Sequence, residues 1–374
     1  MTRLLIFIAA ALAVSLPTAD AFLARSNVAR IGISKLSAVA EGSTTSKYDD
    51  LRSWFTENDG TISNNISIRK STLSGYGYGC FADEELAEGE LLFRIPRAAT
   101  VNLDDCLNDE DCGASFRALQ GKAGPGSDTV LIAGYLAKEW LLIQEYDKQN
   151  DSERLQTIKF EKYLRTLPWK RGLCSQEHVI FWKDADVESL LKGSLAYSDA
   201  QDIRDQTKLA TKVLNAIIGP VIQKVRGGYS SEEVGFRFPW QNDPEEESGS
   251  IVEGLEDAVK GAFVICLSRA FVTPRVTEDG ELEDEERLEP VFDILQHSED
   301  PNIRRECTDD GTVAITAGRY IAKGEELFSQ YKSEGEIPYH KFFTRFGFVP
   351  GVTEPVANLV AERSTIFFPQ RQEV

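Results

Sequence analysis

The stretch VFDILQHSEDPN, residues 291–302, holds Asp293, Gln296 and His297 within five positions, so it is the first candidate for chemistry. The chain has three histidines, and the other two, His178 and His340, lie far from this stretch in sequence. A protein zinc site needs at least three side-chain ligands, and no helical HExxH pair supplies them. The stretch therefore predicts hydrogen bonding and not metal ligation.

Signs of a covalent hydrolase are also missing from the sequence. No G-x-S-x-G elbow occurs, and none of the six cysteines stands in a recognisable nucleophile context. The cysteines form no C-x-x-C pair, and a chain of this length does not need disulfides to fold. We therefore expect reduced thiols and neither a disulfide framework nor a zinc knuckle.

A glycine-rich stretch, GYGCFA at residues 77–82, fits the dinucleotide-binding pattern G-x-G-x-x-A. That pattern binds pyrophosphate only where a helix opens at the glycines, and the residues that follow allow at most one helical turn before Gly89. A Rossmann site is excluded on that ground. Gly77 and Gly79 still allow the backbone to turn or to approach a neighbour or a ligand, and a simple β-turn without a ligand stays open.

The elements that must position these residues follow from hydrophobic spacing. Residues 48–60 have helical spacing, and β-branched and aromatic runs broken by glycines follow over residues 66–102. From about residue 127 to 257 apolar residues recur three and four apart, which predicts helices. Strand-like patterning returns over residues 312–331, so the helices are expected between two β blocks. Residues 277–289, TEDGELEDEERLE, are expected to form a solvated acidic loop.

Composition limits the class of protein and its partners. The 374 residues include 42% hydrophobic residues, which is ample for a packed core. The formal net charge is −19, and residues 1–40 contribute +3, so the rest of the chain carries −22. So acidic a body repels a phosphate backbone, which excludes nucleic acid as an expected partner and favours a basic protein or peptide.

The amino terminus predicts targeting. Residues 1–21 have one basic residue and an apolar run too short to cross a membrane, which predicts a signal peptide cleaved after Ala21 and no stable membrane association. Residues 22–46 contain serines and basic residues and no acidic residue before Glu41, which is typical of a transit peptide. Together, with Phe22 at the junction, they resemble the bipartite presequences of secondary plastids. An ordinary secreted protein is the alternative.

Six stretches in a fixed order resemble the SET-domain protein methyltransferases, and most of all the branch of the Rubisco large-subunit lysine methyltransferases. The resemblance implies an α+β fold, a SET-domain β-fold of several small curved sheets interrupted by a mainly α-helical insertion. The parts expected are the N-terminal part of the SET domain at 47–103, the insertion at 104–262, the C-terminal part at 263–351 and a tail at 352–374. The six stretches are SGYGYGCFADEELAEGELLFRIPRAATVN, FEKYLRTLP, LSRAF, LEPVFDILQHSEDPN, AGRYIAKGEELFSQY and FFTRFGFVPG.

The resemblance implies a site for S-adenosyl-L-methionine. Gly77, Tyr78 and Gly79 match the loop whose backbone meets the methionine part of that cofactor. Arg269 matches the arginine near the cofactor's carboxylate, which suits the fork of a guanidinium group.

DILQH stands at the family's D-x-x-N-H position, where the asparagine and the histidine hold the cofactor. Here Gln296 replaces the asparagine, and its extra methylene is expected to displace the amide. His297 is expected to be a packed, hydrogen-bonding residue and not a base. Phe348 stands where an aromatic ring stacks on the adenine.

Tyr331 matches the family's catalytic tyrosine, and Phe346 stands where a second tyrosine is usual. Ser268, Phe271 and Asp293 are implied, by their family positions, to lie near the channel for the substrate lysine, which Phe346 also lines. Because Phe346 lacks a hydroxyl, our hypothesis is that the channel leaves room for repeated methylation. The residues after Tyr331 read YKSEGEIP, where the family favours a glycine and then an asparagine.

Methyl transfer from a sulfonium to an amine is an in-line displacement that needs neither a metal nor a nucleophilic side chain, but it needs a neutral amine. A free lysine has a pKa near ~10.4, which the sulfonium charge and a narrow apolar channel both lower. Tyr331 would orient the nitrogen or help pass its proton to water.

The function implied is that of an enzyme, an S-adenosylmethionine-dependent protein-lysine N-methyltransferase that acts on a plastid protein, such as Rubisco or another stromal protein. The post-SET cysteine cluster is absent, so no zinc is expected. Only 23 residues follow Gly351, so the helical substrate domain of the Rubisco-type enzymes is not expected. Two alternatives remain: a SET fold that binds proteins with little or no catalysis, motivated by Gln296, and a protein-histidine methyltransferase.

Overall fold

The structure is a computed structural model that describes residues 44–73, 77–123, 127–169, 178–227, 251–276, 280, 282–308, 310–331 and 338–349. The predicted signal peptide, nearly all of the transit-like segment and the predicted tail lie outside these residues. So do residues 332–337, which make up most of the altered segment after Tyr331.

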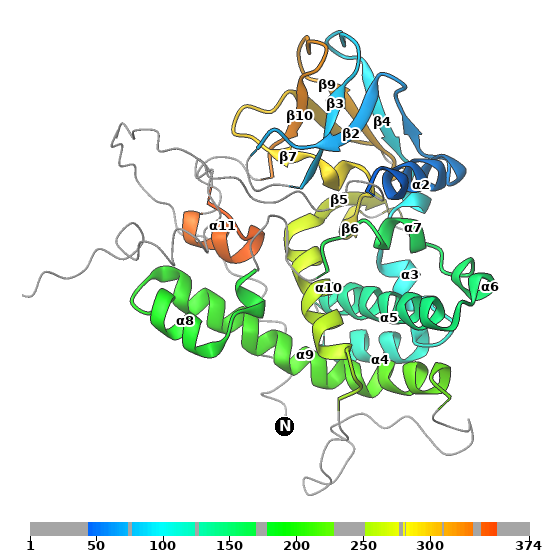
Figure 1. Cartoon of the computed structure of the whole chain (residues 1–374), viewed down its shortest axis with the longest axis vertical. Coiled ribbons are helices and arrows are strands. Elements are labelled where there is room, and N and C mark those ends of the chain that lie inside the picture. Colours follow the sequence, from blue (N-terminus) through cyan, green and yellow to red (C-terminus); the bar gives the residue numbers. More distant parts are fainter. Residues whose placement is uncertain are drawn as a thin grey trace, which may run out of the picture.

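The described chain has two parts, seen in Figure 1 as a group of small sheets above a group of helices. The strands come from both ends of the described sequence, and most of the described helices lie between them, with one helix before the first strand and one after the last. Helix α10 (Leu255–Arg269) runs from the helical part to the sheets, across the predicted boundary at 262–263. The expected α+β fold, small sheets interrupted by a helical insertion, is confirmed.

Three small sheets make up the β part, and each of the two larger ones combines strands from before and after the helices. The first has the order β1 (Thr61–Ile62), β4 (Leu91–Ile95), β9 (Val313–Ala317), β8 (Ile303–Cys307). The second has the order β2 (Ile66–Lys70), β3 (Tyr78–Ala82), β10 (Glu326–Ser329), β7 (Gln296–His297). The third pairs β5 (Ala270–Val276) with β6 (Leu282–Leu288).

Strand β10 is the centre of the second sheet. It pairs antiparallel with β3, with Leu327 opposite Cys80, and parallel with β7, with Phe328 opposite Gln296. Parallel neighbours require a crossover connection, and here β8 and β9 supply it. The pairing brings the glycine-rich stretch and DILQH to either side of one strand.

Helix α5 is the centre of the helical part, and α10 packs along it. Fifteen of the 22 residues of α5 are buried, which explains why its sequence reads as almost continuously apolar. Within the predicted helical region, residues 160–169 form only one helical turn, α7 (Glu161–Leu164). The helices before α10 are α2 (Thr44–Glu57), α3 (Leu103–Leu107), α4 (Gly113–Ala123), α5 (Asp128–Gln149), α6 (Ser152–Leu155), α7 (Glu161–Leu164), α8 (Asp184–Leu191) and α9 (Leu195–Val225).

Helix α11 (Tyr339–Phe346) belongs to two apolar clusters at once. Phe343 packs in a small core with α8 and α9, and its ring lies 5.8 Å from that of Trp182. Phe342 and Phe346 pack with Phe348 in a separate cluster beside Tyr331. Helix α11 therefore joins the helical insertion to the candidate site.

The predicted acidic loop at 277–289 is wrong for residues 282–288, which form β6. Along β6 and just after it, Glu285, Arg287 and Glu289 are buried. Arg287 Nε donates to Glu289 Oε1 at 3.2 Å, and Arg305 Nε donates to Glu289 Oε2 at 3.0 Å. Pairing with Arg287 in β6 itself, with Arg305 in β8 and, for Glu285, with Arg97 allows these carboxylates to be buried.

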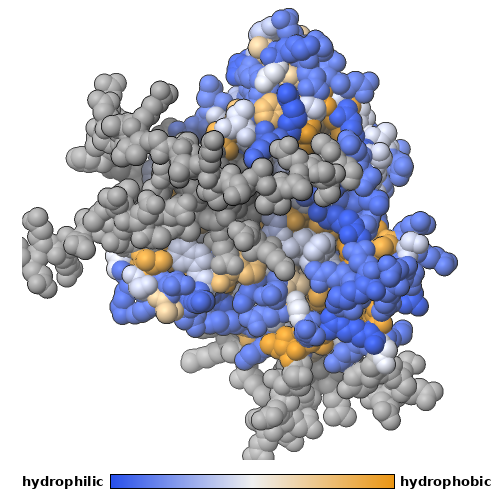
Figure 2. All heavy atoms as spheres, viewed as in Figure 1, coloured by the Kyte–Doolittle hydropathy of each residue, from blue (hydrophilic) through white to orange (hydrophobic). Residues whose placement is uncertain are grey.

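Figure 2 shows a face dominated by hydrophilic residues, with hydrophobic side chains in separate small patches, as expected for so acidic a chain. No helix within the described residues is long and apolar enough to span a bilayer.

Candidate active site

Tyr331 follows β10 and is held at two points by the DILQH stretch. Its hydroxyl donates to the backbone carbonyl oxygen of Leu295 at 2.8 Å, and its backbone N–H donates to Nδ1 of His297 at 3.1 Å. The parallel β7–β10 pairing places these partners beside the end of β10. The position of the Tyr331 side chain is therefore set by DILQH.

Aromatic rings surround Tyr331. Its ring centroid lies 5.3 Å from that of Phe346 and 6.3 Å from that of Phe348, and both phenylalanines are buried. Such tilted and edge-on arrangements are favourable for aromatic pairs. Burial raises the pKa of the Tyr331 hydroxyl, so this group is protonated at neutral pH.

The ring of His297 packs beside those of Tyr331 and Phe348, with centroid distances of 5.2 Å and 6.1 Å. Because its Nδ1 accepts a hydrogen bond, the neutral ring carries its proton on Nε2. Burial lowers the pKa of His297 to about 4. The imidazole is therefore neutral at physiological pH, and its role is to hold Tyr331.

A buried polar cluster adjoins this aromatic one. Arg269, the last residue of α10, donates from Nη1 to the backbone oxygen of Asp293 at 2.8 Å and to Oδ2 of Asp293 at 3.1 Å. Tyr163 of α7 donates its hydroxyl to the same Oδ2 at 2.8 Å. Burial raises the pKa of Asp293 even though Arg269 and Tyr163 favour its carboxylate. The cluster joins the insertion to DILQH.

The backbone just before Asp293 is strained. Val291 has φ 74° and ψ −48°, and its side chain is fully buried. A β-branched residue rarely adopts positive φ, and conformations of this kind cluster at functional sites. The turn at Val291 directs the chain into the short helix Phe292–Ile294, which presents Asp293.

Gln296 joins the glycine-rich stretch to DILQH. Its Nε2 donates to the backbone oxygen of Tyr78 at 2.6 Å, across 218 residues of sequence. The longer side chain that distinguishes this chain from the family pattern therefore forms the cross-link between two of the segments implied to hold the cofactor.

The two glycines have different surroundings. A side-chain β-carbon on Gly77 would meet no atom of the described residues within 4 Å, so they leave the space beside it open. A β-carbon on Gly79 would lie 2.2 Å from Oε1 of Glu326. Gly79 therefore makes room for a neighbouring side chain.

Ser268 and Phe271, which are predicted to lie near the lysine channel, contact residues outside the predicted site. Ser268 donates its hydroxyl to the carbonyl oxygen of Val264 one turn earlier in α10, at 2.6 Å. Phe271 on β5 packs its ring against Phe292 at 5.0 Å. The structure brings the other predicted residues into three adjoining groups: Tyr331, His297, Phe346 and Phe348; Arg269 and Asp293; and Gln296 with Tyr78, Gly77 and Gly79.

Several residues without a predicted role also lie here. Tyr48 of α2 packs its ring on Tyr78 at 4.5 Å, and Lys47 Nζ lies 4.9 Å from the Tyr48 ring. Burial and the charge of Arg269 lower the pKa of Lys47. Tyr163 lies in FEKYLRTLP, one of the six stretches that resemble the SET-domain family, so the sequence could have indicated it. Lys47 and Tyr48 precede all six stretches, so no sequence signal indicated them.

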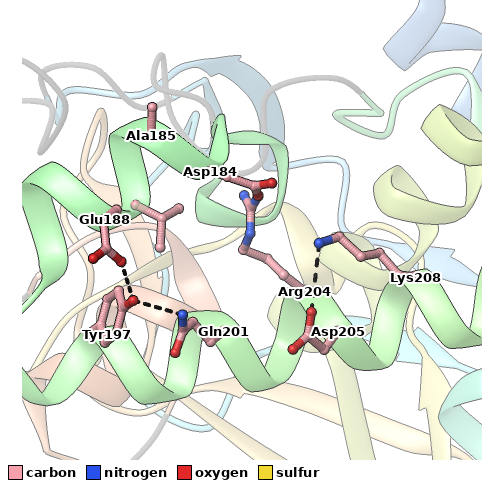
Figure 3. A pocket seen from close by; sticks show the side chains of 9 residues that line it. Asp184, Ala185, Glu188, Tyr197, Gln201, Arg204, Asp205 and Lys208 are labelled. Carbon is pink, nitrogen blue, oxygen red and sulfur yellow. Dashed lines mark hydrogen bonds and ion pairs between the residues drawn. The ribbon is translucent and has the colours of Figure 1, made fainter.

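A cavity of about 460 Å³ lies elsewhere, between α8 and the first half of α9 (Figure 3). Its polar groups pair with each other: Gln201 Nε2 donates to the Tyr197 hydroxyl at 2.8 Å, and Lys208 lies 3.7 Å from Asp205. None of the predicted site residues lines it. The lining residues are Asp184, Ala185, Val187, Glu188, Tyr197, Gln201, Arg204, Asp205 and Lys208.

Small sheets assembled from both ends of the chain, a parallel β7–β10 pairing and a tyrosine held by the D-x-x-Q-H turn define a SET-domain protein. The chain belongs to the SET domain family, whose model matches residues 77–332, more than half of the 374 residues.

Relatives found by sequence carry the name N-lysine methyltransferase SETD6. The Xenopus laevis protein is 26% identical over 72% of this chain and 50% of its own length. The Homo sapiens protein is 24% identical over 78% of this chain and 52% of its own length. The chain thus spans about half the length of the curated relatives it matches.

Solved structures show the same fold. Rubisco LSMT bound to AdoMet aligns with a TM-score of 0.53 and 16% identity, over 82% of this chain and 57% of that one. The SET domain of LSMT bound to MeLysine and AdoHcy aligns with a TM-score of 0.54 and 15% identity, over 82% and 57% of the two chains. The expected resemblance to the Rubisco large-subunit branch is confirmed for the fold.

Proposed function

We propose that this protein is an S-adenosylmethionine-dependent protein-lysine N-methyltransferase. The observation that carries the proposal is the two-point attachment of Tyr331 to DILQH, next to the glycine-rich stretch and inside a shell of aromatic rings. Membership of the SET domain family supports it, as do the names of the SETD6 relatives.

The residues present fit the cofactor. Arg269 Nε is buried and has no hydrogen-bond partner among the described residues, so the guanidinium can still donate to a carboxylate. Open space beside Gly77 admits a ligand close to the backbone. We infer that S-adenosylmethionine is held by Gly77, Tyr78, Gly79, Arg269, Gln296, His297 and Phe348, and when bound it supplies an electrophilic methyl group on a sulfonium.

Tyr331 orients the acceptor amine. Its proton is donated to Leu295, so the lone pairs of its oxygen accept an N–H of the amine and direct the nitrogen's own lone pair toward the methyl group. The buried ring of Phe346 excludes water beside the amine, which lowers the pKa of the lysine and favours its neutral form.

The test combines cofactor binding with methyl transfer. Calorimetric titration of S-adenosylmethionine is expected to give saturable micromolar binding, and radiolabelled cofactor is expected to label proteins of a plastid extract. Fragment mass spectrometry is expected to place the label on lysine. Absence of binding and of labelling would contradict the proposal, and label on histidine would change the acceptor.

We further propose that the substrate is a plastid protein, Rubisco or another stromal protein, with a basic surface that the acidic chain attracts. The composition of residues 1–46 supports import through a signal peptide and a transit peptide. A fluorescent protein fused to residues 1–46 is expected to enter the plastid of an alga with secondary plastids. A fusion that is secreted would contradict this.

A further inference from the structure

The glycine-rich stretch is held from the neighbouring strand by Glu326. This residue is the first of β10, it is 4% exposed, and it stands opposite Phe81 of β3. Its Oε2 accepts hydrogen bonds from the backbone N–H of Thr72, at 2.9 Å, and from the Thr72 hydroxyl. A buried carboxylate needs such partners to offset its lost hydration.

Thr72 lies at the start of the connection between β2 and β3, and Gly77 lies at its end. The two sides of this connection are joined by a hydrogen bond from the Ser71 N–H to the Gly77 carbonyl oxygen, at 3.0 Å. Glu326 therefore anchors the backbone beside Gly77, the first of the three residues 77–79 that the proposed function assigns to the cofactor.

The other carboxylate oxygen explains Gly79. Glu326 Oε1 is buried, has no hydrogen-bond partner among the described residues, and stands 2.2 Å from the place of a β-carbon on Gly79. Any side chain at 79 would displace the carboxylate from Thr72. Gly77, whose surroundings are open, has no such constraint from the protein.

We propose that Glu326 is a positioning residue for the cofactor-binding backbone of residues 77–79, and that residue 79 is a glycine because the Glu326 carboxylate occupies the place of its side chain. The first part rests on the proposed function. The second concerns packing alone, so the two can fail separately.

The test is a double-mutant cycle on the whole protein with Gly79→Ala and Glu326→Ala, which measures melting temperature and S-adenosylmethionine affinity. Each single substitution is expected to lower the melting temperature and to weaken binding by about tenfold, the effect expected of a charge-assisted hydrogen bond. The double variant is expected to be no worse than Glu326→Ala alone, because the alanine at 79 then meets no carboxylate. Additive effects would overturn the inference.

Three further measurements separate positioning from general damage. Glu326→Gln keeps an oxygen acceptor for Thr72 and is expected to restore most of the affinity, whereas Glu306→Gln, at an exposed position on β8, is the matched control. Glu326→Ala is expected to weaken S-adenosylmethionine more than 5′-methylthioadenosine, which lacks the amino-acid part. Equal weakening of both ligands would overturn the positioning role. If the unaltered protein bound neither S-adenosylmethionine nor 5′-methylthioadenosine, the proposed function and the positioning role of Glu326 would both be wrong. The melting temperatures would still test the contact between Glu326 and Gly79.

Discussion

The side-chain amide nitrogen of Gln296 lies 2.6 Å from the backbone carbonyl oxygen of Tyr78, to which it donates a hydrogen bond. Glutamine at this position departs from the family pattern, and its longer side chain forms the hydrogen bond that links β7 to β3. In this chain the glutamine therefore stabilises the contact between these two strands.

Replacing Gln296 with asparagine tests that contribution. Asn is one methylene shorter, so the bond to Tyr78 is lost, and we expect S-adenosylmethionine to bind about fivefold more weakly, which corresponds to one neutral hydrogen bond of ~1 kcal/mol. Calorimetric titration of both proteins measures the difference. Tighter binding by the Gln296→Asn variant would instead mean that glutamine impairs the site.

Replacing Tyr331 with phenylalanine is expected to separate binding from chemistry. The backbone bond to His297 does not involve the hydroxyl, so cofactor affinity is expected to stay within about threefold of that of the unaltered protein. Methyl transfer is expected to fall by about 10²- to 10⁴-fold because the group that orients the amine is gone. Single-turnover transfer from radiolabelled cofactor gives the rate. A variant that transfers at the normal rate would remove Tyr331 from the mechanism.

The pH dependence of methyl transfer follows from the lysine and not from His297. Since the pKa of His297 is lowered to about 4, this ring is already neutral above about pH 5 and contributes no step near 6.5. The neutral fraction of the amine grows as pH rises, so kcat/KM is expected to increase between about pH 6 and 9 and to level off above the substrate's pKa. An inflection near pH 6.5 that disappears in His297→Asn would contradict this.

Phe346 is expected to set how many methyl groups are added. Its ring lies 5.3 Å from that of Tyr331 and carries no hydroxyl, so the unaltered enzyme is expected to give di- or trimethyl-lysine. Phe346→Tyr adds an oxygen that can hold the amine or a water, and we expect higher methylation to fall by about tenfold. Intact-mass analysis of a peptide substrate reports the products. Monomethyl-lysine alone from the unaltered enzyme would contradict the hypothesis.

Glu289 is expected to be among the most sensitive positions for stability. It is fully buried and binds Arg287 and Arg305, and its backbone oxygen accepts from Asp293 two residues beyond the strained Val291. Glu289→Ala removes the acceptor that both arginines share and leaves the fully buried Arg287 with Glu285, 3.9 Å away, as its remaining carboxylate, so we expect a loss of about 3–5 kcal/mol in the free energy of unfolding. Asp284→Ala, at an exposed position of β6, is the control. Urea denaturation measures both, and similar small losses would show that the pairs contribute little.

Hydrophobic spacing predicted the helical region between two β blocks because that signal is local, whereas the fold class came from the resemblance of six stretches to a known family. The apolar spacing of α5 and α9 follows from burial along one chain segment, so periodicity alone reveals it. Strand β6 was missed because Arg97 pairs with Glu285 in the strand and Arg305 pairs with Glu289 just after it, and both arginines lie outside the acidic segment. Charge patterning within a window cannot reveal a partner outside that window.

Sequence could predict only those site residues whose side-chain type is part of a recognisable motif. Tyr331 and His297 lie in recognisable stretches. The group that holds the Tyr331 hydroxyl is the backbone oxygen of Leu295, and because every residue has such an oxygen, the residue type gives no sign of this contact. Glu326 was likewise unpredicted, because its contact with Gly79 depends on the register of β10 against β3. Register is a property of the assembled sheet.

The β3–β10–β7 arrangement also has a consequence for how the protein folds. Its three strands are contributed by residues 78–82, 326–329 and 296–297, so the site has a high contact order and closes only after the loops between them have been ordered. Partly folded chains lack the site, and a ligand that needs it binds the native state alone. S-adenosylmethionine, if it binds as proposed, should therefore raise the melting temperature in proportion to the logarithm of its concentration once the site is saturated.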